Sequence, residues 1–365
     1  MSRVICHIDL AQLCANIEVF RNAAGSCAMM PVLKYDAYGL GALKIGAALK
    51  KCGAVKRFAA ATLEEAVELK QLGLDVQILG VLSDDEIAEA VQQDIICPVC
   101  DRSVAFKIVR EAQKQNKTAR IAVKLDTGMG RLGFIPERDL DEIIECCQLP
   151  GLVRDGLFAH FSTAAVPDLE YANYQIGRFK NVFEALKRAG IDFIWRHHGA
   201  GDATLKIPGA VAEPFNLVRP GGLMYGENFD GACRQIITLR TKIGAVRELP
   251  PGSSIGYYRT FSTDRPMRVA ILAAGYADGI PLALSNRGEV LIHGKRCPIL
   301  GRVAMDYTAV DISDVPEAVA GDDVVLLGRQ GGEAIPIDLW GKMKSTHCHD
   351  IWCAIGRRVK RIYTE

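Results

Sequence analysis

The stretch PVLKYDAYGLG, residues 31–41, ends an apolar run on Lys34. An amine with apolar neighbours loses hydration, which lowers its pKa and makes the neutral form available for attack on a carbonyl. A surface lysine whose stem lies along apolar side chains shows the same pattern. Lys34 taken alone therefore indicates either a nucleophile or a solvated side chain.

Other polar residues that could act with Lys34 also follow short apolar runs. They are carried by the stretches KLDTGMGRLG, AHFST, HHGAGDAT and VRPGGLMYG. The candidates are Lys124, Asp126, Arg131, His160, His198, Asp202, Arg219, Gly221 and Gly222. Exposed amides at glycine turns bind phosphate. A lysine nucleophile, an arginine and a phosphate-binding turn are together typical of a pyridoxal phosphate site.

Eight apolar runs alternate with helical patterns and would place these residues at strand ends. The runs are AMMPVLK, RFAAAT, VQILGVL, IICPVC, RIAVKLDTG, VRDGLFAHF, FIWRHHGA and NLVRPGG, within residues 28–222. Strands that alternate with helices form parallel βαβ units, and eight units over about 200 residues favour a closed barrel. The sequence therefore predicts an α/β fold built on a TIM-type (β/α)8 barrel, with its chemistry in the loops that follow the strands.

Signals at helix starts support this alternation. Thr62-Leu-Glu-Glu65 matches a capping box, and Asp84 and Asp101 are expected N-caps. Residues 169–190 have the pattern of a long helix between the sixth and seventh strands. A further packing helix is predicted upstream, with one apolar face formed by Leu10, Leu13, Ile17 and Phe20.

The pattern changes after residue 235. Runs such as IITLRTKIGAVREL, MRVAILAAGY, GEVLIHGKRCPILGRV, TAVDI and DDVVLLG are separated by turn signals, with no long helix between them. We therefore expect the cofactor-binding barrel in residues 1–235 and a predominantly β C-terminal domain in residues 236–365.

Composition argues for a small substrate. Lysine and arginine number 44 against 43 acidic residues, so no net charge favours nucleic acid or an anionic membrane. No apolar run reaches the ~18 residues of a membrane span, and the N-terminus lacks a signal-peptide pattern, so we expect a cytoplasmic protein. The 12 cysteines are scattered, which favours reduced thiols. Neither Cys97-Pro-Val-Cys100 nor His347-Cys348-His349 has the spacing of a metal site.

Six motifs together resemble the alanine racemase family. They are VLKYDAYG, KLDTGMGRLGF, VRPGGLMYG, SIGYYRTF, GYADG and GRVAMDYTAVDIS, and they span both predicted domains in the order of the family. The resemblance implies the interconversion of L-alanine and D-alanine on pyridoxal 5'-phosphate, which supplies D-alanine for peptidoglycan. It also implies a homodimer whose active sites are shared between subunits.

The resemblance gives two residues the role of acid and base. Lys34 matches the lysine that carries the cofactor, and Tyr257 matches the tyrosine that the partner subunit contributes to the opposite face. Tyr257 is preferred to Tyr258 because it lies nineteen residues before Tyr276, the expected entrance residue. Removing a proton from one face of the α-carbon and returning one to the other needs two such groups.

The remaining matches concern the cofactor and the substrate. Arg219 would lie beside the pyridine nitrogen, Arg131 would orient the substrate carboxylate, and Lys124 matches a lysine that is often carbamylated. Met305 and Asp306 match the segment that faces the substrate carboxylate. The other implied cofactor contacts are Tyr38, His160, His198, Gly221 and Gly222.

Two positions depart from the family pattern at the phosphate end of the site. Gly201-Asp202 stands where the family usually has Asn-Ser, and Arg357 stands where it usually has a tyrosine. One interpretation is that Arg357 bridges Asp202 and the phosphate, because a carboxylate alone would repel that dianion. The alternative is that Asp202 caps a short helix and that Arg357 faces solvent.

Three other functions are weighed against alanine racemisation. The first is a racemase of another small amino acid such as serine, since residues at the entrance select the side chain. A non-catalytic pyridoxal phosphate carrier would share a barrel and a lysine but would normally lack the second domain. A barrel-type amino-acid decarboxylase would carry acidic and cysteine-containing motifs that are not evident in this sequence.

Overall fold

The computed structural model describes residues 3–53, 55–227 and 231–365, and the chain forms two compact units. The barrel unit consists of Ile17–Ala37 and Ala42–Met224. The sheet unit consists of Met1–Asn16, Tyr38–Gly41 and Tyr225–Glu365. Residues 3–16, which we expected in the barrel, are therefore grouped with the C-terminal residues.

Each of the eight predicted runs contains a strand of the barrel unit. The strands are β2 (Ala28–Met29), β3 (Arg57–Ala60), β4 (Asp75–Ile78), β5 (Cys97–Val99), β6 (Ala119–Lys124), β7 (Leu152–Phe158), β8 (Trp195–His197) and β9 (Leu217–Val218). Parallel ladders join β3 to β4, β5 through β8 in order, and β9 back to β2. Single parallel bridges, Val32 to Ala59, Gln77 to Ile96 and Ala200 to Arg219, complete the ring. The predicted (β/α)8 barrel is confirmed.

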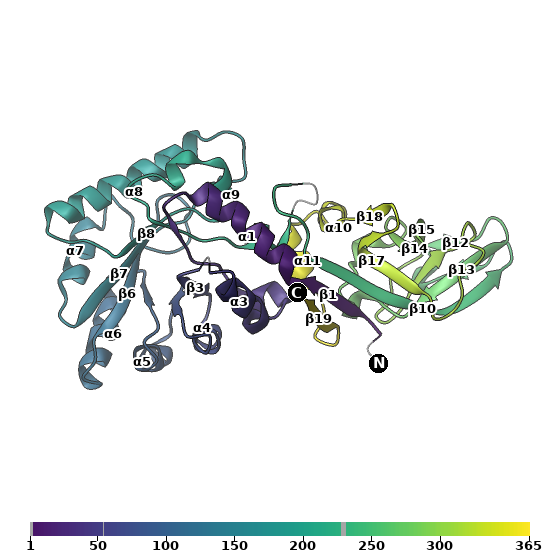
Figure 1. Cartoon of the computed structure of the whole chain (residues 1–365), viewed down its shortest axis with the longest axis horizontal. Coiled ribbons are helices and arrows are strands. Elements are labelled where there is room, and N and C mark those ends of the chain that lie inside the picture. The colour runs from purple at the N-terminus through teal and green to yellow at the C-terminus, as the bar shows by residue number, and fades with distance from the viewer. Residues whose placement is uncertain (1–2, 54, 228–230) are drawn as a thin grey trace. The chain divides into compact units, whose positions relative to one another are not determined.

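Helices α4 to α8 lie outside these strands (Figure 1). The helices that lie wholly or partly in the barrel unit are α1 (Leu10–Ala24), α2 (Lys34–Gly39), α3 (Ala42–Lys51), α4 (Leu63–Lys70), α5 (Asp84–Gln92), α6 (Arg102–Lys114), α7 (Leu140–Gln148), α8 (Glu170–Arg188) and α9 (Gly201–Lys206). The predicted apolar face of α1 is confirmed, because Leu13, Ile17 and Phe20 are fully buried.

The expected helix starts hold with two differences. Asp101 caps α6 by accepting the Val104 N–H at 3.0 Å. The prediction for α5 is wrong by one residue, because Ser83 is its N-cap and Asp84 its first residue. At α4 the Thr62 hydroxyl accepts the N–H of Glu65. In a complete capping box the Glu65 carboxylate would accept the Thr62 N–H. It accepts the N–H groups of Tyr35 and Ala61 instead, so the capping box is only half formed.

The sheet unit is built on nine strands in the order β18-β17-β14-β15-β16-β13-β10-β1-β19. Their bounds are β1 (Ile5–Asp9), β10 (Ile237–Leu249), β13 (Met267–Leu272), β14 (Glu289–Ile292), β15 (Lys295–Leu300), β16 (Thr308–Asp311), β17 (Asp323–Gln330), β18 (Glu333–Ile335) and β19 (Lys360–Thr364). A separate hairpin joins β11 (Ser254–Ile255) to β12 (Phe261–Ser262), and two short helices follow β18: α10 (Ile337–Lys344) and α11 (Cys348–Cys353). The β-rich character predicted for these residues is confirmed.

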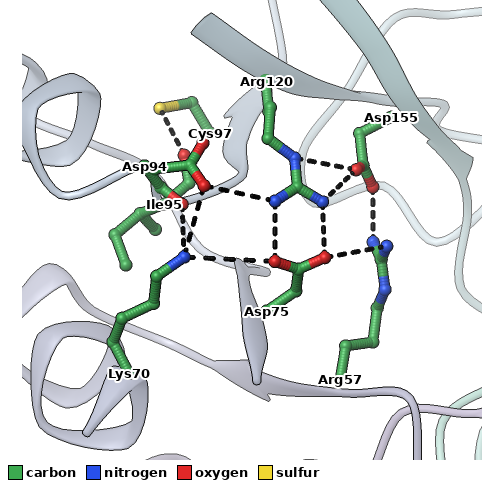
Figure 2. Close-up of polar contacts among 8 residues, drawn as sticks. All are labelled: Arg57, Lys70, Asp75, Asp94, Ile95, Cys97, Arg120 and Asp155. Atoms are coloured by element: carbon green, nitrogen blue, oxygen red, sulfur yellow. Dashed lines mark hydrogen bonds and ion pairs between the residues drawn. The ribbon is translucent and has the colours of Figure 1, made fainter. Parts of the chain in front are cut away.

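An ion network ties the barrel strands together near their N-terminal ends (Figure 2). Arg120 on β6 donates two hydrogen bonds to the Asp75 carboxylate, at 2.7 and 2.6 Å. It donates two more to Asp155, which also pairs with Arg57. Asp155 is the extra residue at a bulge in β7, between Arg154 and Gly156, and it is fully buried. The network links β3, β4, β6 and β7, whose other ends carry the candidate site.

Candidate active site

Lys34 begins a turn of left-handed helix, which we call the Lys34 turn (Lys34–Gly39). The φ angles of residues 35–38 lie between 51° and 60°, and the following Gly39 has φ of 81°. Each non-glycine residue in this conformation costs roughly 1–2 kcal/mol. Lys34 is exposed in this chain, and its place at a strand end, which left both a nucleophile and a solvated side chain open, stays a prediction of its role.

Two carboxylates hold the Lys34 turn. The Tyr35 N–H donates to one oxygen of Glu65 at 2.6 Å, and the Ala61 N–H donates to the other at 2.8 Å. The Asp36 carboxylate accepts the N–H of Ala42 at 2.6 Å. The turn is thus bound on one side to the end of β3 and on the other to the start of α3.

The glycine-rich loop after β6 is organised by the side chain of Asp126. One of its oxygens accepts the N–H groups of Gly128, Met129 and Gly130, and the other accepts the N–H of Arg131 at 2.9 Å. Burial raises the pKa of Asp126, but these four donors outweigh burial and lower the pKa below its ordinary value. The loop fixes the backbone of Arg131 and leaves its side chain exposed.

Arg219, directly after β9, is buried in a cage of acceptors. One nitrogen, Nη1, donates to the His197 carbonyl at 3.1 Å and to His197 Nδ1. The other, Nη2, donates to the carbonyls of Ala159 at 2.7 Å and His198 at 3.0 Å, and lies 3.3 Å from His160 Nδ1. The charge is held by neutral groups, and burial followed by the Arg131 charge lowers the pKa of Arg219.

Lys124, the last residue of β6, is also buried. Its Nζ lies 4.4 Å from the centroid of the Phe158 ring. Burial, and then the charge of Arg219, lowers the pKa of Lys124 to about 8. A larger fraction of this amine is therefore neutral near neutral pH than for an ordinary lysine, and the neutral amine is the form that adds to carbonyl groups and carbon dioxide.

His160 lies within the field of four cations. Burial lowers its pKa to about 3, assisted by the charges of Arg219, Lys124, Arg131 and Lys34. The charges of residues that were predicted at separate strand ends thus all lower the pKa of one imidazole, which is neutral. An environment of this charge suits an anionic ligand.

His198 and the two glycines after β9 are placed close to Arg219 in the chain fold. His198 is buried, stacks on Phe161 with ring centroids 3.7 Å apart, and has Nε2 3.3 Å from the Thr127 hydroxyl. Gly221 and Gly222 are buried, and the N–H of Met224 donates to the Gly221 carbonyl. The His198 ring is therefore held by packing and by Thr127, and its carbonyl oxygen accepts from Arg219.

Asp202 lies in the first turn of α9. The prediction that it caps this helix is wrong, because Ala200 is the N-cap and no side chain caps it. The Asp202 carboxylate instead accepts from Lys206 Nζ at 2.6 Å. Arg357, in the sheet unit, is exposed, and the expected pairing of Asp202 with Arg357 stays a prediction.

The sheet unit carries the candidate tyrosines. Tyr257 and Tyr258 open a short 3₁₀ turn, η3 (Tyr257–Arg259), after Gly256, and both are exposed, by 66% and 84%. Tyr276, also exposed, opens a similar turn, η4 (Tyr276–Asp278). Tyr38 is buried instead, and its ring centroid lies 5.2 Å from that of His349.

The segment with Met305 and Asp306 is joined to the turn of Tyr276. The N–H of Ala277 donates to the Met305 carbonyl, and Asp278 and Asp306 both accept from the Arg358 guanidinium, at 2.7–2.9 Å. Gly275 is needed for this approach, because a Cβ there would lie 2.2 Å from the Ala304 carbonyl oxygen.

Three residues of this arrangement were missed in the sequence. His197 directly precedes the expected His198 in the HHGAGD motif, and only His198 was predicted to belong to the site. Glu65 was assigned to helix capping, and Arg358 is the neighbour of the expected Arg357. Only the adjacency of like residues could have pointed to His197 and Arg358.

Comparison with known proteins follows the same division of the chain. The family model for the alanine racemase N-terminal domain matches residues 8–229, and that for the alanine racemase C-terminal domain matches residues 236–363. The chain belongs to the alanine racemase family. A relative named alanine racemase 2, from Caldanaerobacter subterraneus, is 37% identical over 98% of this chain and 93% of its own.

Solved alanine racemase structures resemble the whole chain. The enzyme from D-cycloserine-producing Streptomyces lavendulae has a TM-score of 0.93 and 31% identity, covering all of this chain and 98% of its own. The enzyme from Bartonella henselae, solved with covalently bound pyridoxal phosphate, has a TM-score of 0.87 and 27% identity over the full length of both.

The residues present in this alanine racemase family member fit pyridoxal phosphate. The cofactor carries a phosphate and the substrate carries a carboxylate, so both need cationic partners. Four cationic side chains lie close enough to His160 to lower its pKa. Arg219 is fixed by carbonyl groups on strands' ends rather than by a carboxylate, so its charge remains available to a bound ring. The described residues contain no cluster of histidine, cysteine and acidic side chains suited to a metal ion.

Proposed function

We propose that this protein is a pyridoxal 5'-phosphate-dependent isomerase that interconverts L-alanine and D-alanine (EC 5.1.1.1), with Lys34 and Tyr257 as its two proton-transfer groups. Membership of the family over both domains supports the reaction and the cofactor. The single observation in the fold that carries the assignment of the site is the group of cationic side chains around His160, with Arg219 held by backbone carbonyls beside it.

Lys34 would hold the cofactor covalently through its amine. When bound, the cofactor supplies an electron sink that makes the α-proton of an attached amino acid acidic. Lys34 Nζ would then move a proton on one face of the α-carbon, and the hydroxyl of Tyr257 of the partner subunit would move one on the other. The exposure of Tyr257 in this chain supports a role toward a partner.

The other residues would bind and orient. Arg131 would bind the substrate carboxylate, together with the backbone at Met305 and Asp306. Tyr38, His160, His198, Asp202, Gly221, Gly222 and Arg357 are the proposed contacts of the cofactor and its phosphate. Arg219 would face the pyridine nitrogen, where a fixed cation disfavours a second positive charge and so limits side reactions.

Lys124 would act through Arg131. Because burial and Arg219 lower the pKa of Lys124 to about 8, its neutral amine is accessible for carbamylation by carbon dioxide. A carbamate would carry a negative charge and bind the Arg131 guanidinium, whereas an ammonium would repel it. The environment of Lys124 thus supports the proposed modification.

We place the protein in the cytoplasm as a homodimer that supplies D-alanine for peptidoglycan. No helix in the described part of the chain is long and apolar enough to span a membrane. Several large apolar or aromatic residues of the sheet unit are exposed and would be available to a partner subunit. They are Tyr257, Tyr258, Tyr276, Met305 and Tyr307.

The match of residues 236–363 to the second domain of the family separates this protein from a barrel-only cofactor carrier. Reduction with borohydride tests the cofactor assignment directly, because it fixes the cofactor to the lysine that holds it. Peptide mapping of the reduced protein is expected to find the pyridoxyl group on Lys34. A label on any other lysine would refute this assignment.

A further inference from the structure

The Lys34 turn adopts its left-handed form with little help from its own sequence. Tyr35, Ala37 and Tyr38 have side chains that disfavour positive φ, and only Asp36 tolerates it. Contacts from outside the turn must therefore hold it. Backbone strain of this kind persists where the surrounding structure determines it, commonly at active sites.

Glu65 provides an external contact at Tyr35, the residue after Lys34. It projects from α4, the helix after β3, and binds the first left-handed residue through the Tyr35 N–H at 2.6 Å. Its second oxygen binds the N–H of Ala61, one residue beyond β3, at 2.8 Å. The Thr62 hydroxyl accepts the N–H of Glu65 itself, which fixes the start of the helix that carries it.

The two hydrogen bonds need two acceptor oxygens. An ionised carboxylate offers both, whereas the amide of glutamine offers one acceptor oxygen and an NH₂ group that would face an N–H donor. Glu64, its neighbour, is exposed and belongs to the same first turn of α4. Replacing each acid by its amide therefore separates the contact with the turn from a general loss of charge at this helix start.

We propose that Glu65 is a positioning residue for Lys34. Its carboxylate binds the left-handed turn to the end of β3 and so fixes the position of the Lys34 backbone. Glu65 acts on the lysine through the backbone of Tyr35. The consequence for catalysis rests on the proposed role of Lys34, but the clamp itself does not.

Amide hydrogen exchange of the cofactor-free protein tests the clamp. In Glu65→Gln we expect the peptide that covers residues 34–38 to exchange at least about tenfold faster than in the wild type, as one lost hydrogen bond to a charged acceptor would allow. Glu64→Gln is the matched control and should exchange at the wild-type rate. Equal rates in the Glu65→Gln and wild-type proteins would overturn the proposal.

Kinetics of the holoenzyme test the positioning role. Glu65→Gln should lower kcat about tenfold or more and leave KM for alanine within a few-fold, because Arg131 still binds the carboxylate. Unchanged kcat with a loosened turn would refute positioning. If Glu65→Gln does not fold, Glu65→Asp, which keeps the charge but shortens the reach, takes its place in both measurements.

The same reduction experiment separates this inference from the proposed function. Failure to label Lys34 in the wild type would remove the catalytic role of the lysine. The exchange rates of the turn would still test the contact with Glu65, because they do not depend on the role of Lys34. Faster borohydride-trapped labelling of Lys34 in the wild type than in Glu65→Gln is the expected outcome if both are correct, and equal rates would contradict the clamp's effect on the lysine.

Discussion

At the scale of single residues, the site depends on groups that hold other groups. Asp126 binds four backbone N–H groups to present Arg131, and Glu65 binds two to present the Lys34 turn. Arg219 is held by three carbonyl oxygens at the ends of two neighbouring strands, β7 and β8. The reactive side chains are placed mainly through their backbones, which allows Lys34 and Arg131 to stay exposed.

Tyr257 and Tyr258 compete for the second proton-transfer role. We expect Tyr257→Phe to reduce racemisation about 10²–10⁴-fold, because a positioned acid or base supplies that much, and to leave the visible absorbance of the bound cofactor intact. Tyr258→Phe serves as the control and should retain most activity. The reverse result would show that the register of this loop is assigned one residue too early.

The types and spacing of residues predicted which residues belong to the site, but not their backbone conformation or their contacts. The motifs around Lys124, Arg131, His160 and Arg219 located four groups that electrostatics couples in the fold. The left-handed form of the Lys34 turn could not be predicted, because Tyr35 and Ala37 carry no signal for positive φ. The partner of Asp202 was also missed, since an i, i+4 pair with Lys206 competes with the distant arginine.

At the scale of elements, the buried ions near the N-terminal strand ends hold the barrel rather than its chemistry. Asp155 is fully buried and pairs with two arginines, so its charge is compensated twice (Figure 2). Removing one partner of a buried pair leaves an uncompensated charge, which costs about 3–5 kcal/mol.

We therefore expect Asp155→Asn to lower the free energy of unfolding by about 3–5 kcal/mol, measured by urea denaturation at fixed protein concentration. Asp84→Asn is the control, because Asp84 pairs with Lys107 on the surface and should contribute less than about 1 kcal/mol. Equal effects of the two substitutions would show that the network is not a stabilising element.

The elements themselves could largely be predicted from the sequence. All eight barrel strands and helix α8 occur where apolar periodicity placed them. The errors lie at the ends, as with Ser83 instead of Asp84, since adjacent polar residues are equally good N-caps by type. The capping box at Thr62 was only half right, because the backbone of Tyr35 competes for the carboxylate of Glu65.

At the scale of the whole molecule, the expected boundary and the compact units differ at the N-terminus. Strand β1 pairs with β10 and, in parallel, with β19, so that Ile5 is opposite Lys360. Local patterns contain no information about a partner this distant in the chain.

Folding places three histidines where they cannot readily be protonated. Burial is the main cause that lowers the pKa of His160 to about 3 and the pKa values of His197 and His198 well below their ordinary value. The unfolded chain binds protons at these groups below pH 6.5 and the folded chain does not, so stability falls as the pH decreases from about 6.5 toward 3. Each histidine contributes up to about 1.4 kcal/mol per pH unit in this window.

Proton uptake on unfolding measures this effect. Calorimetry at about pH 5 in buffers of different ionisation enthalpy is expected to find about three protons taken up by these groups, and about one fewer in His160→Asn. Uptake of less than one proton would mean that the three imidazoles are charged in the folded protein.

This chain is expected to racemise alanine on pyridoxal phosphate with Lys34 as an essential group. Circular dichroism of L-alanine and, separately, of D-alanine, incubated with the purified protein and the cofactor, tests it most directly. Both signals are expected to decay to zero, the equal mixture of enantiomers, and Lys34→Ala should stop the decay. A persistent signal with wild-type protein that has bound the cofactor, or decay with serine but not with alanine, would contradict the claim.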